Sequence, residues 1–398
     1  MHPHAIPKPR LTDALDEAQR RCDAGIPLAQ WFDRKVRGHM EACAGLPSRP
    51  LSSPQADAAI DDRLNQPAKR RRTIYVHVPF CKCICSFCAF FRQPTGASDL
   101  EAYTQAVAAQ IDATARTTWA QQGPPFEAVY FGGGTPTALE PMQLARLVTS
   151  IRNHYPLADD CEFTVECRFD GLDQQYLKRL HDAGINRLSF GVQSFDTAVR
   201  RGVGRIADRD QVVETIGLAS RLGFEQINLD LIYNLPDQTP GTPGSWADDI
   251  VTLIETPATG ASVYALIPMR GSALVKQIEA GRKQPLGDCS REYDMFTAAY
   301  DALMNRRGWR RFSFHHFGDA RHERSVYNQV RSGGMDTLGL GCGGGGQLGN
   351  LSTMNAMDVQ QYVDAWTDGR PSPVMAFEQP QRVTDLGGVY RLTESDGI

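Results

Sequence analysis

The sequence has neither a long apolar run nor an excess of positive charge. No apolar stretch in its 398 residues approaches the roughly 18–20 residues that a membrane-spanning helix needs. Its first ten residues contain three prolines and two histidines, and they lack the apolar core of a secretory signal. Lys and Arg total 42 against 46 Asp and Glu, a net charge of −4, which does not favour nucleic-acid binding. We therefore expect a cytoplasmic protein with no membrane span and no nucleic-acid partner.

Nucleotide-binding fingerprints are also missing. Gly132-Gly133-Gly134 follows an apolar run, but it is not G-x-G-x-x-G, and no P-loop lysine accompanies it. Six short β-rich runs alternate with segments of helical periodicity, which indicates parallel βαβ units and an α/β fold. The runs are Thr73–Val78, Ala128–Phe131, Glu162–Glu166, Arg187–Val192, Gln226–Ile232 and Ser262–Ile267. Six such units favour a barrel, or part of one, with its chemistry at the carboxyl ends of the strands.

This alternation divides the chain into three parts. We predict an N-terminal extension over residues 1–70, a (β/α)6 core over 71–270 and a C-terminal α/β segment over 271–398. The last part contains a helical pattern at Arg291–Asn305, a β-like run at Arg310–Phe314 and seven glycines between Gly339 and Gly349. That glycine density indicates either a close backbone approach or a flexible turn.

The ten cysteines are unevenly distributed. Cys81, Cys83, Cys85 and Cys88 lie within eight residues, whereas the other six are scattered. In the spacing Cys81-x3-Cys85-x2-Cys88, three thiolates can bind three irons of a [4Fe-4S] cluster, which normally takes four cysteines. One iron is then left with an open coordination position. A zinc site is the alternative, although no second cysteine or histidine pair completes a tetrahedral set. We interpret Cys83 as a bystander.

The cysteine triplet, with the aromatic Phe87 before its last cysteine, resembles the radical S-adenosylmethionine (SAM) superfamily. Further stretches resemble the branch that contains coproporphyrinogen III dehydrogenase (HemN): Tyr75–Cys88, Phe131–Pro136, Asn186–Phe195 and Asp230–Pro236. The resemblance implies a partial (β/α)6 TIM-like barrel, with the C-terminal segment over residues 271–398 covering the substrate. It also implies that the open iron binds SAM, and that an electron from the cluster cleaves SAM to methionine and a 5′-deoxyadenosyl radical.

Positions that match the family's motifs acquire cofactor-binding roles by resemblance. Gly133, Gly134 and Thr135 match a loop beside the methionine amino group of SAM, and Glu166 matches a carboxylate that contacts the cofactor. The remaining matches are Gln193, Arg205 and Asp230, with lesser contacts at Tyr75, Phe87 and Ala265. An ion-pair network inside the barrel is the alternative reading of Glu166, Arg205 and Asp230, and core packing is that of Tyr75 and Phe87.

Within this branch the chain is most similar to the anaerobic haem-degrading methyltransferases of the HutW/ChuW type. HemN itself has a fourth cysteine where this chain has Phe90. Similarity to the haem-degrading enzymes lies in Phe87–Phe91, Glu166–Gly171, Gly308–Arg310, Glu323–Asn328 and Leu338–Gly344. It implies two SAM molecules, methyl transfer to haem or a related porphyrin, ring opening to a linear tetrapyrrole and iron release. Reduced flavodoxin or a reduced flavin is the implied electron donor.

Two other functions remain open: a coproporphyrinogen oxidase-like reaction and a haem chaperone of the HemW type. On the substrate side, His315 and His316 follow the late β-like run and are candidates for an axial ligand of haem iron. Cys342, in the glycine-rich segment, is a further candidate for a substrate-side role.

Overall fold

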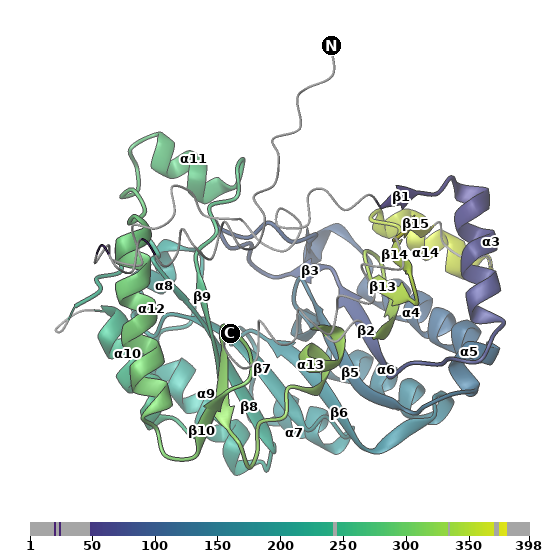
Figure 1. Ribbon diagram of the computed structural model, residues 1–398, viewed down its shortest axis with the longest axis horizontal. Helices are drawn as coiled ribbons and strands as arrows, with labels where there is room; N and C mark the ends of the chain where they lie inside the picture. Colours follow the sequence, from purple (N-terminus) through teal and green to yellow (C-terminus); the bar gives the residue numbers. More distant parts are fainter. Residues whose placement is uncertain are drawn as a thin grey trace.

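The computed structural model describes residues 48–241, 245–332, 335–369 and 374–379, together with Arg20 and Ala24. Six parallel strands form the middle of a 13-stranded sheet (Figure 1). They are β2 (Arg72–Val78), β5 (Phe126–Gly133), β6 (Leu157–Cys167), β7 (Arg187–Gln193), β8 (Gln226–Tyr233) and β9 (Gly260–Ala265). Each contains most or all of one β-rich run of the sequence, so the predicted α/β fold with a parallel core is confirmed. In the described residues the sheet runs from β1 at one edge to β10 at the other.

Helices cover one face of this parallel core, because that face is apolar. Ile74, Val76 and Val78 of β2 are fully buried in the main core. The helices between the strands are α4 (Leu100–Ala115), α5 (Thr118–Gln121), α6 (Pro141–His154), α7 (Gln174–Asp182), α8 (Thr197–Gly202), α9 (Arg209–Arg221) and α10 (Ser245–Glu255). Their ends follow local chemistry: the Asp99 carboxylate accepts hydrogen bonds from the first turn of α4, and Gly223, with φ of 91°, follows α9.

The opposite face of the same strands is polar, although parallel strands are usually apolar on both faces. Alternate positions of β7 and β8 are mostly polar: Arg187, Ser189 and Gln193 in β7, and Gln226, Asn228 and Asp230 in β8. The register pairs Ser189 with Asn228 and Arg187 with Gln226, so these side chains form rows across the sheet. The face of the sheet that the helices leave uncovered therefore carries a row of polar and ionisable side chains.

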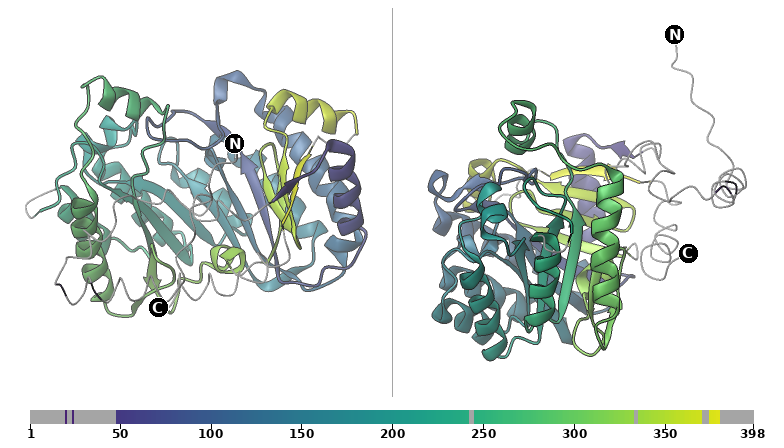
Figure 2. Two further views of the ribbon diagram at one scale, coloured as in Figure 1. Left: turned by 45° about the horizontal axis from the view of Figure 1, so that its top comes forward. Right: turned by 90° about the vertical axis from the view of Figure 1, so that its left-hand side faces the viewer.

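The C-terminal part of the chain extends the sheet at both edges (Figure 2). β11 (His316–Asp319) pairs with β9 and with β10 (Trp309–Arg311), so the predicted late β-like run is the beginning of a hairpin. At the other edge β12 (Asp336–Leu340) pairs parallel with β2. Beyond it lie β13 (Gly345–Leu348), β14 (Leu351–Asn355), β15 (Val374–Glu378) and β1 (Arg49–Pro50).

The remaining elements are shorter or peripheral. Helices outside the core are α3 (Ser53–Leu64), α11 (Ala273–Glu279), α12 (Cys289–Met304), α13 (Val326–Ser332) and α14 (Val359–Thr367). The cysteine-containing loop carries the two-residue strands β3 (Phe80–Cys81) and β4 (Gln93–Pro94), and the 3-10 turns η2 (Thr95–Ala97) and η3 (Pro136–Ala138) complete the set. No helix in the described ranges has the length and apolar character to cross a membrane.

The glycine-rich segment is ordered by close backbone contact. A Cβ on Gly344 would lie 2.2 Å from the Leu340 carbonyl oxygen, and one on Gly339 would lie 2.7 Å from the Gly345 backbone. Gly341, with φ of 81°, faces the His77 carbonyl. Of the two sequence-based alternatives, close approach therefore applies, and the partner is the chain itself. The three-part domain division stays a prediction, and residues 1–47, apart from Arg20 and Ala24, lie outside the described residues.

Candidate functional site

The cysteine loop follows β2 at the carboxyl end of the parallel strands. Cys81 and Cys85 are buried, and Cys88 is half-buried. Burial raises the pKa of the Cys81 thiol, the Thr135 hydroxyl lowers it, and the neighbouring Cys85 and Cys88 thiols raise it. The Cys81 thiol is therefore within electrostatic range of the other two thiols of the predicted triplet. Cys83 is half-buried and instead lines a shallow hollow of about 550 Å³, together with Ile84, Arg201, Gly204, Arg205 and Ile206.

A cluster and a single metal ion require different arrangements of these thiols. Within the described part of the chain, no three His, Cys, Asp or Glu side chains converge as ligands of one metal ion would. Cubane ligands need no such convergence, because each thiolate binds a different iron. Buried cations also lie near the thiols. The Arg168 guanidinium donates to the Cys85 sulfur at 3.6 Å. Desolvation lowers the pKa of buried Arg205, and the Cys85 and Cys81 thiols oppose that shift. An anionic thiolate cluster suits such surroundings.

The glycine-rich turn after β5 packs directly on the cysteine loop. The Gly134 amide donates to the Val78 carbonyl at 2.9 Å, and a Cβ on Gly134 would lie 2.8 Å from the Pro79 carbonyl carbon. The Thr135 hydroxyl lies 3.4 Å from the Cys81 sulfur. Gly133, with φ of 116°, lies against the His77 ring. The turn therefore needs glycine for its own packing, before any ligand is considered.

Glu166 lies beside this turn at the end of β6. Its carboxylate accepts hydrogen bonds from the Tyr130 hydroxyl at 2.9 Å and the Gly133 amide at 3.3 Å. Burial raises the pKa of Glu166 to about 7, while the Tyr130 hydrogen bond opposes that rise. Tyr130 is on β5, and Tyr75 is on β2, the strand on its other side. The Tyr75 ring is stacked on that of Tyr130 at 6.3 Å, and the Tyr75 hydroxyl lies 3.0 Å from Nδ1 of His77.

The other polar candidates lie further along the same strand ends. The Ser189 hydroxyl donates to Asp230 at 2.9 Å, and burial raises the pKa of Asp230. Gln193 has a left-handed φ of 68°, which turns the chain sharply at the end of β7. A Cβ on Gly191 would lie 2.9 Å from the side-chain Nε2 of Gln193 and 3.1 Å from Nη2 of Arg205. The ends of those two side chains are therefore both close to Gly191. Glu166, Gln193, Arg205 and Asp230 thus occupy one end of the polar face.

The two lesser apolar candidates pack on neighbouring clusters. Phe87 is half-buried against an apolar cluster that includes Val199, Val203 and Leu266. Ala265, the last residue of β9, is half-buried against the main core. Both have protein contacts of their own, and any cofactor contact would add to these.

The three substrate-side candidates differ in accessibility. His316 is buried, with Nδ1 at 3.0 Å from the Ser262 hydroxyl and Nε2 at 3.3 Å from Glu323. Cys342 is fully buried, and its thiol donates to the Ala356 carbonyl at 3.0 Å. His315 is half-buried with its ring 4.5 Å from that of Tyr264, and burial lowers its pKa to about 4. Only His315 among the three presents its ring without a hydrogen bond to a described side chain, whereas His316 and Cys342 would have to leave their partners to reach a ligand.

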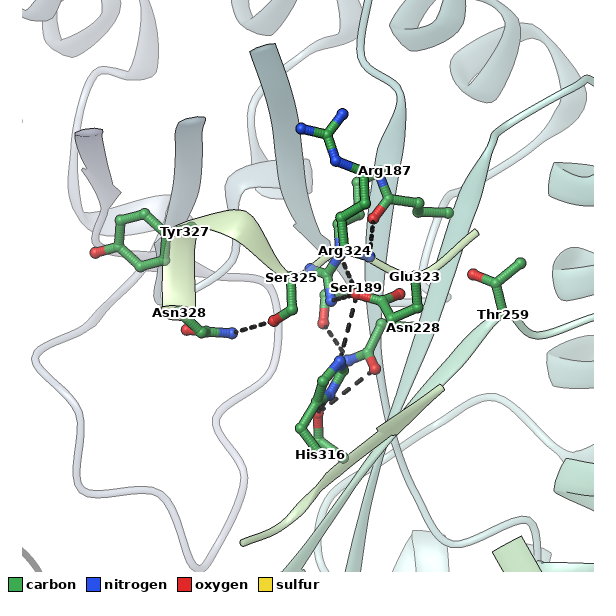
Figure 3. Close-up of polar contacts among 12 residues, drawn as sticks. Arg187, Ser189, Asn228, Thr259, His316, Glu323, Arg324, Ser325, Tyr327 and Asn328 are labelled. Carbon is green, nitrogen blue, oxygen red and sulfur yellow. Dashed lines mark hydrogen bonds and ion pairs between the residues drawn. The ribbon is translucent and has the colours of Figure 1, made fainter. Parts of the chain in front are cut away.

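Sequence reasoning missed a buried ion network under the same polar face. Figure 3 shows Glu323 between Arg187 and His316, with the Glu323 carboxylate 3.0 Å from Arg187 Nη2. On the next strand, Glu162 accepts hydrogen bonds from the first amides of α13, Val326 at 3.0 Å and Tyr327 at 3.2 Å. The polar alternation of β7 and β8 was the signal that such a network existed. The partners come from a distant loop that the alternation does not identify.

Through this network α13 is fixed on the polar face. The Tyr327 ring is stacked on Tyr130 at 4.6 Å and on Tyr75 at 6.1 Å. Tyr130 in turn holds Glu166, so the position of α13 is linked to the position of that carboxylate.

Comparison with known proteins places this geometry in a family. The Radical SAM superfamily model matches residues 75–250. Anaerobilin synthase of Escherichia coli O157:H7 is 32% identical over 350 residues, which cover 88% of this chain and 76% of that protein. Heme chaperone HemW of Bacillus subtilis is 32% identical over 74% of this chain and 75% of its own length. Oxygen-independent coproporphyrinogen III oxidase of Pseudomonas aeruginosa is 30% identical over 75% of this chain and 66% of its own length.

The fold has a solved counterpart as well. The structure of coproporphyrinogen III oxidase (HemN) from Escherichia coli superposes with a TM-score of 0.73 and 23% identity, covering 90% of this chain and 85% of that one. The strand order, the three-cysteine loop after β2 and these similarities agree, and the chain belongs to the radical SAM superfamily of enzymes, in its HemN-like branch.

Proposed function

We propose that this enzyme opens the haem ring under anaerobic conditions, by methyl or methylene transfer from SAM, to give a linear tetrapyrrole and release iron. The observation that carries the proposal is the extent of similarity to anaerobilin synthase. That similarity covers 88% of this chain, against 74% for the chaperone and 75% for the coproporphyrinogen oxidase. The additional coverage matters because the parallel core is common to the whole branch.

The superfamily implies a [4Fe-4S] cluster and SAM as cofactors. We assign cluster binding to Cys81, Cys85 and Cys88, which leaves one iron for SAM. When bound, the cluster supplies the electron that cleaves SAM. Two observations support the assignment: Cys81 is within electrostatic range of Cys85 and Cys88, and the buried Arg168 guanidinium donates to the Cys85 sulfur.

The chain's own residues have distinct parts in holding SAM. We assign recognition of the SAM amino group to Glu166, which Tyr130 and Gly133 orient at the end of β6. Arg205 and Gln193 suit the SAM carboxylate, since a guanidinium offers two parallel donors to a carboxylate. Asp230, held by Ser189 and Asn228, suits a hydroxyl-rich part of the cofactor. Two SAM molecules are part of the proposal, one as the radical source and one as the carbon donor.

A flat macrocycle needs exposed apolar surface near these strand ends. Such surface exists at the end of β9 and just after it, and in the turn between β10 and β11: Tyr264, Ile267, Met269 and Phe314 are 37%, 40%, 43% and 55% exposed. We propose that haem or a related porphyrin lies against these side chains, beside His315. The electron donor in the proposal is reduced flavodoxin or a reduced flavin.

Anaerobic turnover tests the proposed reaction. Reconstituted protein is incubated with dithionite, SAM and haem, while the Soret band, free iron and tetrapyrrole products are followed. We expect bleaching of the Soret band, release of one iron per haem and a methylated linear tetrapyrrole. The matched control is Cys85→Ala, which should bind haem without bleaching it. Haem that stays intact while SAM is cleaved would contradict the proposal.

The second candidate is a haem chaperone, favoured by the 32% identity to HemW, which equals that to anaerobilin synthase. The same experiment separates the two functions. Stoichiometric haem binding without turnover supports the chaperone, and carbon dioxide from coproporphyrinogen supports an oxidase-like reaction.

A further inference from the structure

Arg168 links the end of β6 to the cysteine loop. Its Nη1 donates to the Cys83 carbonyl and, at 3.6 Å, to the Cys85 sulfur. Its Nη2 lies 3.0 Å from the Asp170 carboxylate, and its side chain is 8% exposed. The backbone at Arg168 is fixed too, because its amide donates to the Thr137 hydroxyl at 3.3 Å. The guanidinium is therefore held in place, with one nitrogen directed at a candidate cluster ligand.

Positive charge is in excess around this contact. Arg168, Arg200 and Arg205 are 7%, 1% and 9% exposed and lie close enough to repel one another. Asp170 and Asp249 are the carboxylates that act on this group. Among the described residues, Arg168 Nε and Nη2 and Arg205 Nε are buried with no hydrogen-bond partner. Arg168 is paired with Asp170, but three buried guanidinium groups face only two carboxylates here. Buried positive charge in excess is costly, so this region is suited to an anionic group.

The two neighbours of Arg168 are directed elsewhere. The Arg200 side chain donates to the carbonyls of Val192, Ser194 and Ala207, which places it within the protein scaffold. Arg205 lies above Gly191 with Gln193. Arg168 is thus the member of the group whose guanidinium donates a hydrogen bond to a cysteine sulfur.

We propose that Arg168 sets the reduction potential of the cluster by donating to the Cys85 sulfur. The inference rests on the cluster assignment of the proposed function, not on haem as its substrate. One-electron reduction adds a negative charge to the cluster, while the guanidinium stays protonated, so no proton moves. A fixed, buried cation and a hydrogen bond to a ligand sulfur both favour the reduced state and raise the potential. Arg168 is a positioning residue here, acting through Cys85.

The test is a redox titration of the reconstituted protein with dithionite, monitored by electron paramagnetic resonance without haem or SAM. Arg168→Gln should lower the ratio of reduced to oxidised cluster at least tenfold at a fixed potential, which corresponds to about 59 mV for one electron. Lys82→Gln is the matched control, because it removes one positive charge from the same loop at an exposed position. Solvent screens that charge, so the potential should stay near the wild-type value.

A wild-type potential in cluster-loaded Arg168→Gln, or an equal shift in Lys82→Gln, would overturn the inference. If the Gln variant loses its cluster, Arg168→Lys decides, since Lys keeps the charge but cannot reach the Cys83 carbonyl, Asp170 and the Cys85 sulfur together. A reduction potential below the wild-type value in Arg168→Lys supports the proposed role of Arg168, and a wild-type potential in that variant contradicts it. Wild-type protein that binds no cluster would refute both this inference and the cluster assignment. Failure to open haem would refute the proposed reaction alone.

Discussion

The carboxyl group of Glu166 has an environment that makes its charge depend on pH near neutrality. Burial raises its pKa from 4.5 to about 7, against the hydrogen bond from Tyr130. Because the folded-state pKa is the higher one, the contribution of this group to stability is fully present below pH 4.5 and is lost as the pH rises through 7. Its use as a hydrogen-bond acceptor follows the opposite trend, since only the ionised form accepts at full strength.

We therefore predict a pH-dependent difference in SAM affinity between the wild type and Glu166→Gln. At pH 8 the wild type should bind SAM about tenfold more tightly, the value of one hydrogen bond to a charged group. Near pH 6 the difference should vanish. Calorimetric titration of the anaerobic protein with SAM measures it, and a difference that is constant from pH 6 to 8 would contradict the assignment of Glu166.

A second residue-scale prediction concerns the buried pair of Arg187 and Glu323, whose side chains are 2% and 0% exposed. Burial alone would raise the pKa of Glu323, but the Arg187 charge and His316 hold it at about 2. Glu323→Gln removes the carboxylate that contacts buried Arg187 and leaves only the charge of Glu162 to act on it, so it should lower the free energy of unfolding by about 3–5 kcal/mol.

The control for that variant is Asp160→Asn, which breaks the exposed ion pair with Arg324 and should cost less than about 1 kcal/mol. Urea unfolding at pH 7 measures both variants. The stabilisation by Glu323 should be present above pH 4.5 and decline as the pH falls towards 2, because its folded-state pKa is depressed. Equal losses of unfolding free energy in the two variants would show that the buried pair stabilises the protein no more than the exposed pair does.

At the scale of elements, the parallel strands were predictable and their partners were not. All six β-rich runs correspond to strands, since apolar β-branched runs between helical stripes follow from local preference. The helical segments expected between these runs are also present, and in α6 the residues Leu144, Leu147, Val148 and Ile151 are buried. Family resemblance supplied the candidates at the strand ends. Family resemblance included the stretch Glu323–Asn328, but neither source assigned a role to Tyr130, Tyr327 or Glu323. Their roles depend on long-range contacts of β5 and β7 with the segment around α13.

The turn after β5 provides the element-scale prediction. A Cβ on Gly134 would lie 2.8 Å and 2.9 Å from backbone atoms of Pro79 and Phe80, so Gly134→Ala must displace the start of the cysteine loop. We expect cluster content to fall to less than half, with the melting temperature of the chain changed by only a few degrees. Gly96→Ala, in open space on the same loop, should retain full iron and sulfide content. Full content in Gly134→Ala would show that the turn does not position the cysteines.

At the scale of the whole molecule, the C-terminal segment is part of the same sheet as the parallel core. β12 supplies the strand beside β2, and β11 supplies the strand beside β9, so residues after 315 pair with both ends of the parallel core. Glu323 and α13 then lie on its polar face. The predicted core of residues 71–270 would leave two long strand edges and buried charges without partners.

We predict that a fragment of residues 71–270 is aggregated or lacks cooperative unfolding, whereas residues 48–398 unfold cooperatively. Circular dichroism during thermal denaturation, with size-exclusion chromatography, measures this. A monomeric fragment with the same transition as the longer chain would instead establish residues 71–270 as an independent domain.

The most direct test of the account is whether three cysteines hold a cluster with an open iron. Anaerobically reconstituted wild-type protein and Cys83→Ala should each contain four irons and four sulfides, and their reduced spin signal should change when SAM is added. Cys81→Ala, Cys85→Ala and Cys88→Ala should lose both the cluster and SAM cleavage. Three results would contradict the account. They are zinc bound in place of iron, a spin signal that does not change when SAM is added, and cluster binding that requires Cys83 but not one of the other three cysteines.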